Sequence, residues 1–299
     1  MQPSNVKAIV AMLAAVASFA VMDVALKQLS GSYPALQVAC LRALASMPFL
    51  LVALAWKGNW RALRMNRPYL QLFRGALGVV MLSTFVFAVS HMSLANTYAL
   101  YLCAPLMVTA LSGPVLGAQV PLTRWLAIIA GFCGAMVVLQ PASTGFDAAA
   151  SIAAAVSAVC YAIAALTISV LGRTDSRTSM VFSFTAAMAI GAGVLAAPHW
   201  QPVQMQHAAL IALLGLAGAA GQYFVTEAFS RALPFVVAPF EYTAIVWAFV
   251  FDWLFWQVSP SAPVVVGSAI VIGCGLFIIW DERRRDPQSA SAPALSAHD

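Results

Sequence analysis

Residues 5–29, NVKAIVAMLAAVASFAVMDVALKQL, form a long apolar run in which Lys7, Asp23 and Lys27 are the charged residues. The run is slightly longer than the roughly 20 residues that an α-helix needs to cross a bilayer. Nine further apolar runs of similar length follow, separated by short loops, at 34–56, 68–91, 96–117, 122–140, 148–171, 177–197, 207–231, 235–256 and 262–281. This pattern predicts an all-α polytopic membrane protein with ten transmembrane helices.

The basic residues outside the bilayer fall at every second gap between the runs. They are Lys7, Lys57, Arg61, Arg64, Arg67, Arg124, Arg173, Arg177, Arg231, Arg283, Arg284 and Arg285. The intervening loops, at 31–33, 92–95, 141–147, 198–206 and 257–261, contain no Lys or Arg. Because cytoplasmic loops are enriched in positive charge, this alternation predicts that both termini are cytoplasmic.

The composition excludes an ordinary soluble domain. Charged residues make up 8% of the 299-residue chain, and hydrophobic residues make up 62%, whereas soluble domains carry roughly a quarter charged residues. We interpret the net charge of +5 as an orientation signal at the cytoplasmic loops, not as a nucleic-acid patch. The polar stretch 282–299 is expected to be a disordered cytoplasmic tail.

Sequence motifs for other functions are absent. The five cysteines all lie within apolar runs and show no CxxC spacing, so neither a disulfide framework nor a zinc site is expected. The chain has no P-loop, HExxH, GxSxG or TVGYG sequence, which argues against an ATP-driven pump, an intramembrane protease and a potassium-type channel. We therefore expect no enzyme activity, no cofactor and no metal ion.

Weak internal similarity suggests that the chain is duplicated. Gly75 and Gly78 recur 140 residues later as Gly215 and Gly218, and Ala14-Ala15-Val16 recurs as Ala154-Ala155-Val156. Glycine and alanine at such positions let helices approach closely in lipid. A unit of five helices crosses the membrane an odd number of times, so its second copy would enter from the opposite side.

The expected division is a first five-helix repeat at 1–145, a second at 146–281 and the tail at 282–299. Inverted repeats of this kind are a recurrent architecture of secondary transporters. The predicted partners are a small-molecule substrate and the lipid bilayer. A monomer fits this pattern, although Gly113 and Gly117 leave packing between subunits open.

Five stretches carry a resemblance to a known family. They are AAVASFAVMDVALKQLSGSYP at 14–34, ALQVACLRALASMP at 35–48, RGALG at 74–78, AVSHMSLANTYALYLCAPL at 88–106, and LLGLAGAAGQYFVTEAFSRALPFVVAPFEYTAIVWAFVFDWLFW at 213–256. Along residues 5–281 the chain resembles the EamA-type branch of the drug/metabolite transporter superfamily. The resemblance implies a multi-pass protein of the bacterial inner membrane that exports amino acids, aromatic or otherwise neutral, or related metabolites by alternating access. YddG-type amino-acid exporters are the nearest relatives that the resemblance suggests.

Two other functions remain open at this point. Related branches of the family take up nucleoside-like cofactors such as S-adenosylmethionine, so uptake is an alternative to export. An intramembrane enzyme acting on a lipid or an undecaprenyl carrier is the alternative from another class, and the sequence shows no motif for it.

Charged residues inside the apolar runs are candidates for a site, because a charge at mid-bilayer costs about 2.5–3.5 kcal/mol even on insertion scales. Asp23 and Lys27 are four residues apart, share one helix face and can pair. Arg42 is expected at comparable depth. These three residues would form either a structural tie between two helices or a contact for a substrate carboxylate or a proton.

Glu227 and Glu241 are expected at matching depth on adjacent arms of a helical hairpin. Two carboxylates that share a low-dielectric site tend to hold a proton, which makes this pair a candidate for proton coupling. The alternative is that they are interfacial carboxylates bonded to Arg231 or other loop arginines. Arg74 is expected to snorkel to the cytoplasmic headgroups, and Asp252 to be hydrated near the outer surface.

Polar and aromatic side chains within the runs complete the predicted substrate site, because deep tyrosines need a hydrogen-bond partner or a wet cavity. In addition to Asp23 and Lys27, the candidates are Thr84, Tyr98, Tyr101, Tyr161, Gln222, Tyr223 and Trp247. Pro105 and Pro239 interrupt the fourth and ninth runs and are predicted hinges for alternating access.

Overall fold

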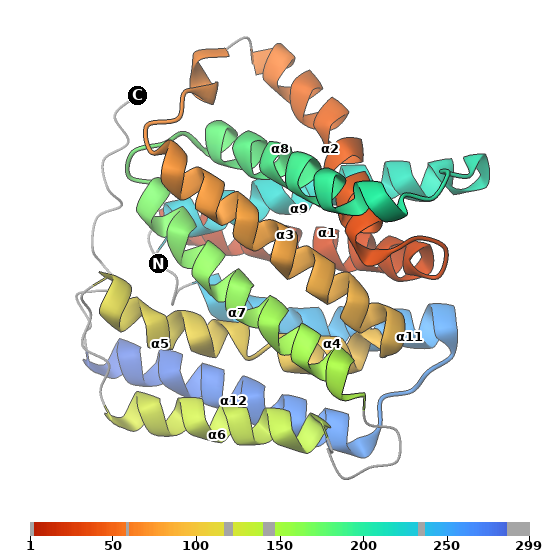
Figure 1. Ribbon diagram of the computed structural model, residues 1–299. Helices are drawn as coiled ribbons and strands as arrows, with labels where there is room; N and C mark the ends of the chain where they lie inside the picture. The colour runs from red at the N-terminus through yellow and green to blue at the C-terminus, as the bar shows by residue number, and fades with distance from the viewer. Residues whose placement is uncertain (1–2, 58–59, 117–121, 140–146, 233–236, 286–299) are drawn as a thin grey trace.

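The computed structural model describes residues 3–57, 60–116, 122–139, 147–232 and 237–285. All regular secondary structure in these ranges is helical, and the long helices lie roughly parallel or antiparallel to one another (Figure 1). The helices are α1 (Pro3–Ser30), α2 (Ala35–Lys57), α3 (Pro68–His91), α4 (Leu94–Tyr101), α5 (Ala104–Leu116), α6 (Leu122–Leu139), α7 (Ala148–Leu171), α8 (Arg177–Ala196), α9 (Ala208–Arg231), α11 (Ala244–Trp256) and α12 (Ala262–Arg285). Short 3₁₀ segments are η1 (Trp60–Leu63), η2 (Ala197–His199), η3 (Met205–His207) and η4 (Ala238–Thr243). The helices therefore coincide with the apolar runs.

The fourth and ninth runs are broken, whereas the sequence predicted one helix for each. A turn at residues 102–103 separates α4 from α5, and η4 precedes α11. Pro105 and Pro239 each lie in the first turn of the segment that follows the break, where the missing N–H removes no helical hydrogen bond. The prolines thus begin new helical segments and do not kink a continuous helix.

Length and composition identify six helices among the described residues that could cross a membrane. They are Val6–Ser30, Ala35–Trp56, Pro68–His91, Ala148–Leu171, Arg177–His199 and Met205–Arg231. Shorter apolar helices cover Leu94–Val108, Trp125–Val138 and Ala262–Phe277. Apolar side chains on the outer face of the bundle, such as Ile129 on α6 and Leu276 on α12, are exposed, as a lipid-facing surface requires.

The closest helix pairs combine the two halves of the sequence. α1 packs on α9, α3 on α7, α2 on α8 and α6 on α12, so the first helix of each half lies on the third helix of the other. The repeated glycines permit two further contacts between the halves, of α2 with α9 and of α3 with α8. A side chain at Gly215 of α9 would collide with the backbone of Ala45 in α2, and one at Gly75 of α3 would collide with Ala187 in α8.

Helix α12 extends into the stretch 282–299 that the sequence assigned to a tail. α12 continues to Arg285, because Glu and Arg favour helix and cations near the last turn stabilise its negative end. The disorder expected for residues 286–299 and the packing expected for Gly117 lie outside the described residues.

Candidate substrate cavity

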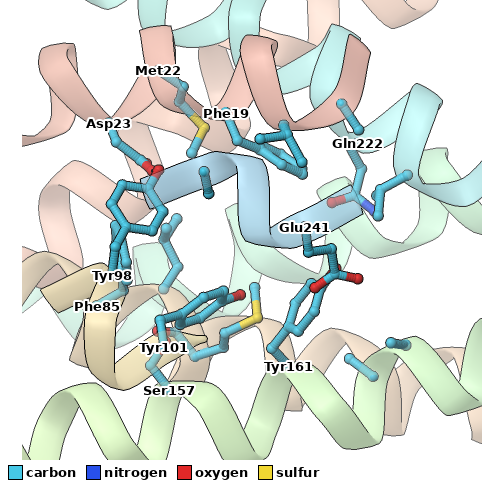
Figure 2. Close-up of a pocket in the computed structure, with 18 of the residues that line it drawn as sticks. Phe19, Met22, Asp23, Phe85, Tyr98, Tyr101, Ser157, Tyr161, Gln222 and Glu241 are labelled. Atoms are coloured by element: carbon cyan, nitrogen blue, oxygen red, sulfur yellow. The ribbon is translucent and has the colours of Figure 1, made fainter. Parts of the chain in front are cut away.

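A cavity lies inside the bundle, between helices from both halves. It measures about 110 Å³ as the space open to the centre of a water molecule, whereas one water needs roughly 10–15 Å³ on this measure. Nine of the charged, polar, aromatic and proline residues singled out from the sequence line it: Asp23, Arg42, Arg74, Tyr98, Tyr101, Pro105, Tyr161, Gln222 and Glu241. Figure 2 shows six of them, with Asp23 and Glu241 on opposite sides of the space.

Asp23 on α1 marks one end of the cavity. The Tyr98 hydroxyl on α4 donates a hydrogen bond to its Oδ2 atom. Its Oδ1 atom is buried and has no hydrogen-bond partner among the described residues. One half of this carboxylate is therefore available to a ligand.

Arg42 on α2 lies in the same part of the cavity and interacts electrostatically with Asp23. Its Nε atom donates to the Met22 sulfur at 3.0 Å, and its Nη1 atom donates to the Met188 sulfur at 3.5 Å. Thioether sulfurs are weak acceptors, and Arg42 has no ion pair with a carboxylate in the described chain. The structural tie expected of Asp23, Lys27 and Arg42 is thus not formed among the described residues: Lys27 pairs with Asp252, and the Asp23 carboxylate accepts from Tyr98.

Glu241 in η4 marks the other end of the cavity. Tyr161 of α7 hydrogen-bonds to its carboxylate, and Figure 2 shows the two side chains facing each other. Its Oε1 atom is buried and lacks a hydrogen-bond partner among the described residues. The same pairing of an acid with a tyrosine occurs at Asp23, but the positions are exchanged. In the first half the acid lies on the first helix and the tyrosine on the broken fourth helix, whereas in the second half the tyrosine lies on the first helix and the acid on the broken fourth.

Arg74 on α3 also lines the cavity, and here the expectation from the sequence was wrong. Its side chain does not snorkel to the surface but is 2% exposed, because α7 and α8 cover this face of α3. Nη1 donates to the Met180 carbonyl at 2.9 Å, the guanidinium lies 4.5 Å from the Phe184 ring centroid, and Nε has no partner in the described part of the chain. Arg74 also interacts electrostatically with Tyr161.

Four aromatic rings connect the two ends and are called the aromatic strip below. Their order is Tyr98, Phe85, Tyr101 and Tyr161, with successive centroid distances of 6.0, 5.6 and 5.3 Å. These separations are typical of contacting aromatic rings. Phe85 carried no signal in the sequence, because an apolar residue in an apolar helix is unremarkable until its neighbours are known.

Lys27 does not pair with Asp23. Its Nζ atom lies 3.3 Å from Asp252 Oδ1 on α11 and 4.5 Å from the Trp256 ring centroid. Asp252 also accepts hydrogen bonds from the backbone N–H groups of Leu94 at 3.1 Å and Ala95 at 2.7 Å. The Asp252 side chain is only 1% exposed. The prediction that it is hydrated was therefore wrong, because its carboxylate accepts hydrogen bonds from the first turn of α4. We call these groups the Lys27–Asp252 cluster.

Glu227 and Glu241 do not form the expected carboxylate pair. Glu227 lies on the face of α9 that meets α8 and forms ion pairs with Arg177, at 3.1 Å, and with Arg231. Glu241 instead lines the cavity. Arg231 follows Glu227 by one helical turn, a spacing that favours pairing within the helix.

Three other predicted substrate residues lie outside the cavity. The Thr84 hydroxyl donates to the Val80 carbonyl of its own helix at 2.8 Å. Trp247 on α11 is 37% exposed and stacks on Phe251. Tyr223 lines a smaller pocket between α2, α8 and α9, because its neighbour Gln222 occupies the face of α9 that turns toward the cavity.

Comparison with a solved structure supports the fold. A crystal structure that is 17% identical in sequence covers 93% of this chain and 98% of its own, with a TM-score of 0.70. At this identity the likeness concerns the fold alone.

Characterised relatives span most of the chain. The pseudopaline exporter CntI of Pseudomonas aeruginosa is 27% identical over 264 residues, which are 87% of this chain and 92% of the relative. The riboflavin transporter of Rhizobium johnstonii is 29% identical over 83% of this chain and 80% of its own. The S-adenosylmethionine uptake transporter of Rickettsia prowazekii is 24% identical over 88% of each chain.

These relatives export or import different small molecules, and none of the three is named as an amino-acid exporter. The finer likeness to YddG-type exporters is therefore not supported. Residues 6–140 match the EamA-like transporter family. Together with the relatives, this match indicates a membrane transporter of small molecules that is similar to the EamA-like family over its first half.

Proposed function

We propose that this transporter exports amino acids or closely related amphipathic metabolites through the central cavity by alternating access. The proposal rests on one observation, the incomplete hydrogen bonding of two buried charged side chains. Asp23 and Arg42 line the same cavity, yet among the described residues one carboxylate oxygen has no hydrogen-bond partner and the guanidinium donates only to sulfur atoms. Buried charged groups with incomplete hydrogen bonding are costly, so a ligand with an ammonium and a carboxylate group would satisfy both residues.

The chemistry of the lining fits such a solute. The planar guanidinium of Arg42 suits a carboxylate through two parallel hydrogen bonds. The Asp23 carboxylate would accept hydrogen bonds from the ammonium group. The aromatic strip offers an apolar surface for the solute's side chain.

Alternating access is supported by the crosswise pairing of the helices. The first helix of each half packs on the third helix of the other, as two inverted repeats would do if they rocked about the cavity. On the topology expected from the basic residues, both termini are cytoplasmic, the membrane is the bacterial inner membrane and the Lys27–Asp252 cluster lies at the outer mouth. Pro105 and Pro239, at the two helix breaks, are the hinges in this proposal.

Coupling to protons would rest on Glu241 and Asp23, since Glu227 is engaged in ion pairs at the helix ends. Facilitated export down a substrate gradient needs no titrating group. The two mechanisms differ in one measurement, because only coupled export drives solute uphill when a proton gradient is imposed on liposomes.

Counterflow in liposomes tests the proposed substrate class. Purified protein would be offered labelled neutral, basic and aromatic amino acids, with riboflavin and S-adenosylmethionine in parallel. We expect saturable exchange of amino acids. Exchange of none of them by folded protein would refute the proposal.

The second candidate is uptake of a nucleoside-like cofactor. The names of two relatives favour it, because one transports riboflavin and another takes up S-adenosylmethionine. Exchange of either compound without exchange of amino acids would establish this alternative in place of the first.

A further inference from the structure

The cavity contains a second set of ligand-binding groups beyond the set used above. We call Asp23, Tyr98 and Arg42 the Asp23 set, and Glu241, Tyr161 and Arg74 the Glu241 set. Each set combines a carboxylate, a tyrosine bonded to that carboxylate, and an arginine without an ion pair among the described residues. All six side chains line the same cavity.

The two carboxylates share one feature, and only the arginines differ, since Arg42 donates to sulfur atoms whereas Arg74 keeps an unsatisfied Nε atom. Asp23 Oδ1 and Glu241 Oε1 are both buried without a hydrogen-bond partner in the described part of the chain, and so is Arg74 Nε. Each arginine faces a phenylalanine, Arg42 at 6.0 Å from Phe19 and Arg74 at 4.5 Å from Phe184. Polar atoms in protein interiors are normally paired, so these three are groups that a ligand could bind at the two ends of the cavity.

The aromatic strip joins the two sets. It begins at Tyr98, which belongs to the Asp23 set, and ends at Tyr161, which belongs to the Glu241 set. Figure 2 shows this arrangement, with Tyr101 between the two ends. A solute that reaches both sets must therefore have an apolar middle section that lies along the rings.

We propose that the Glu241 set is a second amino-carboxylate subsite, and that the cavity selects solutes carrying an amino-carboxylate group at each end. This inference rests on the proposed function, because it assigns the same chemistry to the other end of the same cavity. Two carboxylates and two guanidinium groups have no net formal charge. A solute with two zwitterionic ends is also neutral, so binding would pair every buried charge without leaving an excess.

Four probes with chains of similar length test the second subsite. 2,6-Diaminopimelate has two amino-carboxylate ends, lysine lacks one carboxylate, 2-aminopimelate lacks one amine, and norleucine lacks both groups at its far end. Affinity would be measured by thermal stabilisation of the purified full-length protein in detergent. We expect diaminopimelate to bind at least about tenfold more tightly than each of the others, since each missing charged group removes charge-assisted hydrogen bonds.

Matched variants locate the effect. Glu241→Gln should lower the affinity for diaminopimelate to that for 2-aminopimelate, and should leave 2-aminopimelate unchanged, because that probe has no amine at its second end. Tyr161→Phe should have a smaller effect in the same direction, and it keeps the ring in place if Glu241→Gln folds poorly. Glu227→Gln serves as the control and should change none of the four affinities.

Equal binding of diaminopimelate and norleucine by the wild type would overturn the inference. So would a full preference for diaminopimelate in Glu241→Gln, or the absence of stabilisation by all four probes. Exchange of single amino acids without a preference for diaminopimelate would refute the second subsite alone. Tight binding of diaminopimelate without exchange of any amino acid would refute the proposed transport instead.

Discussion

The Lys27–Asp252 cluster and the central cavity are both buried and charged, but they differ in how completely their charges are paired. Asp252 has an ammonium group and two backbone N–H groups as partners, and Lys27 adds the face of Trp256. In the cavity, Asp23 and Glu241 each have an oxygen without a hydrogen-bond partner in the part of the chain that the structure describes. Both regions draw on the same helix, since Lys27 and Asp23 lie one turn apart on α1.

This difference separates structural charges from ligand-binding charges. A buried ion pair stabilises a fold only when further hydrogen bonds satisfy both partners, and the Lys27–Asp252 cluster meets that condition by joining α1, α4 and α11. The carboxylates of the cavity do not meet this condition, because hydrogen bonds from the described residues do not satisfy all their oxygens. The comparison therefore predicts that mutations in the cluster lower stability, and that mutations in the cavity mainly lower binding.

The largest effect on stability is expected for Asp252→Ala. This change leaves Lys27, which is 14% exposed, without its counter-charge and the N–H groups of Leu94 and Ala95 without this acceptor, for a loss of about 3 kcal/mol. Thermal and denaturant unfolding of the purified protein would measure it. Asp147→Ala is the matched control, because Asp147 caps α7 at Ala150 without a buried cation and should cost only about 1 kcal/mol. A loss equal to that of the control would contradict the structural role of the cluster.

A smaller loss is expected for Tyr98→Phe. The hydroxyl is the donor that the structure gives to Asp23, and its removal leaves a second buried oxygen unsatisfied, at a cost of about 1–3 kcal/mol. Tyr69→Phe is the control, since Tyr69 is 87% exposed. If Tyr98→Phe lowered the free energy of unfolding as much as Asp252→Ala, the contrast between the cavity and the cluster would be contradicted. A ligand that binds the cavity should restore part of the stability that Tyr98→Phe loses.

The smallest effect is expected for Glu227→Gln. Its partners Arg177 and Arg231 are 39% and 31% exposed, and ion pairs at exposed sites contribute about 0–1 kcal/mol. Unfolding and counterflow should both remain close to those of the wild type. Loss of transport in this variant would show that Glu227 takes part in transport, and would contradict its role as a partner of Arg177 and Arg231 only.

The sequence was sufficient to predict the helices but not the direction of each side chain. Apolar runs and loop charges depend on local composition, so the ends of α3 and α7 agree with the predicted runs. The breaks after Tyr101 and before Ala244 were not predicted, because an apolar run shows no interruption where the backbone changes direction.

Pairing of the buried charges could not be predicted from spacing. Asp23 and Lys27 satisfy the four-residue rule, but the partner of Lys27 lies 225 residues away on α11. Arg74 was placed at the surface from its depth alone, whereas α7 and α8 bury it. Thr84 and Phe85 are adjacent in sequence, and only the packing of α3 shows that the phenylalanine, not the threonine, faces the cavity.

Counterflow by Arg42→Gln tests the central claim most directly, namely that the unpaired charges of the cavity belong to the substrate. The variant would be reconstituted beside the wild type and Glu227→Gln, with a labelled amino acid that the wild type exchanges. We predict that exchange falls at least about tenfold in Arg42→Gln, while its unfolding temperature and the control variant change little. Undiminished exchange by a folded Arg42→Gln protein would show that the guanidinium does not bind the solute and would contradict the account.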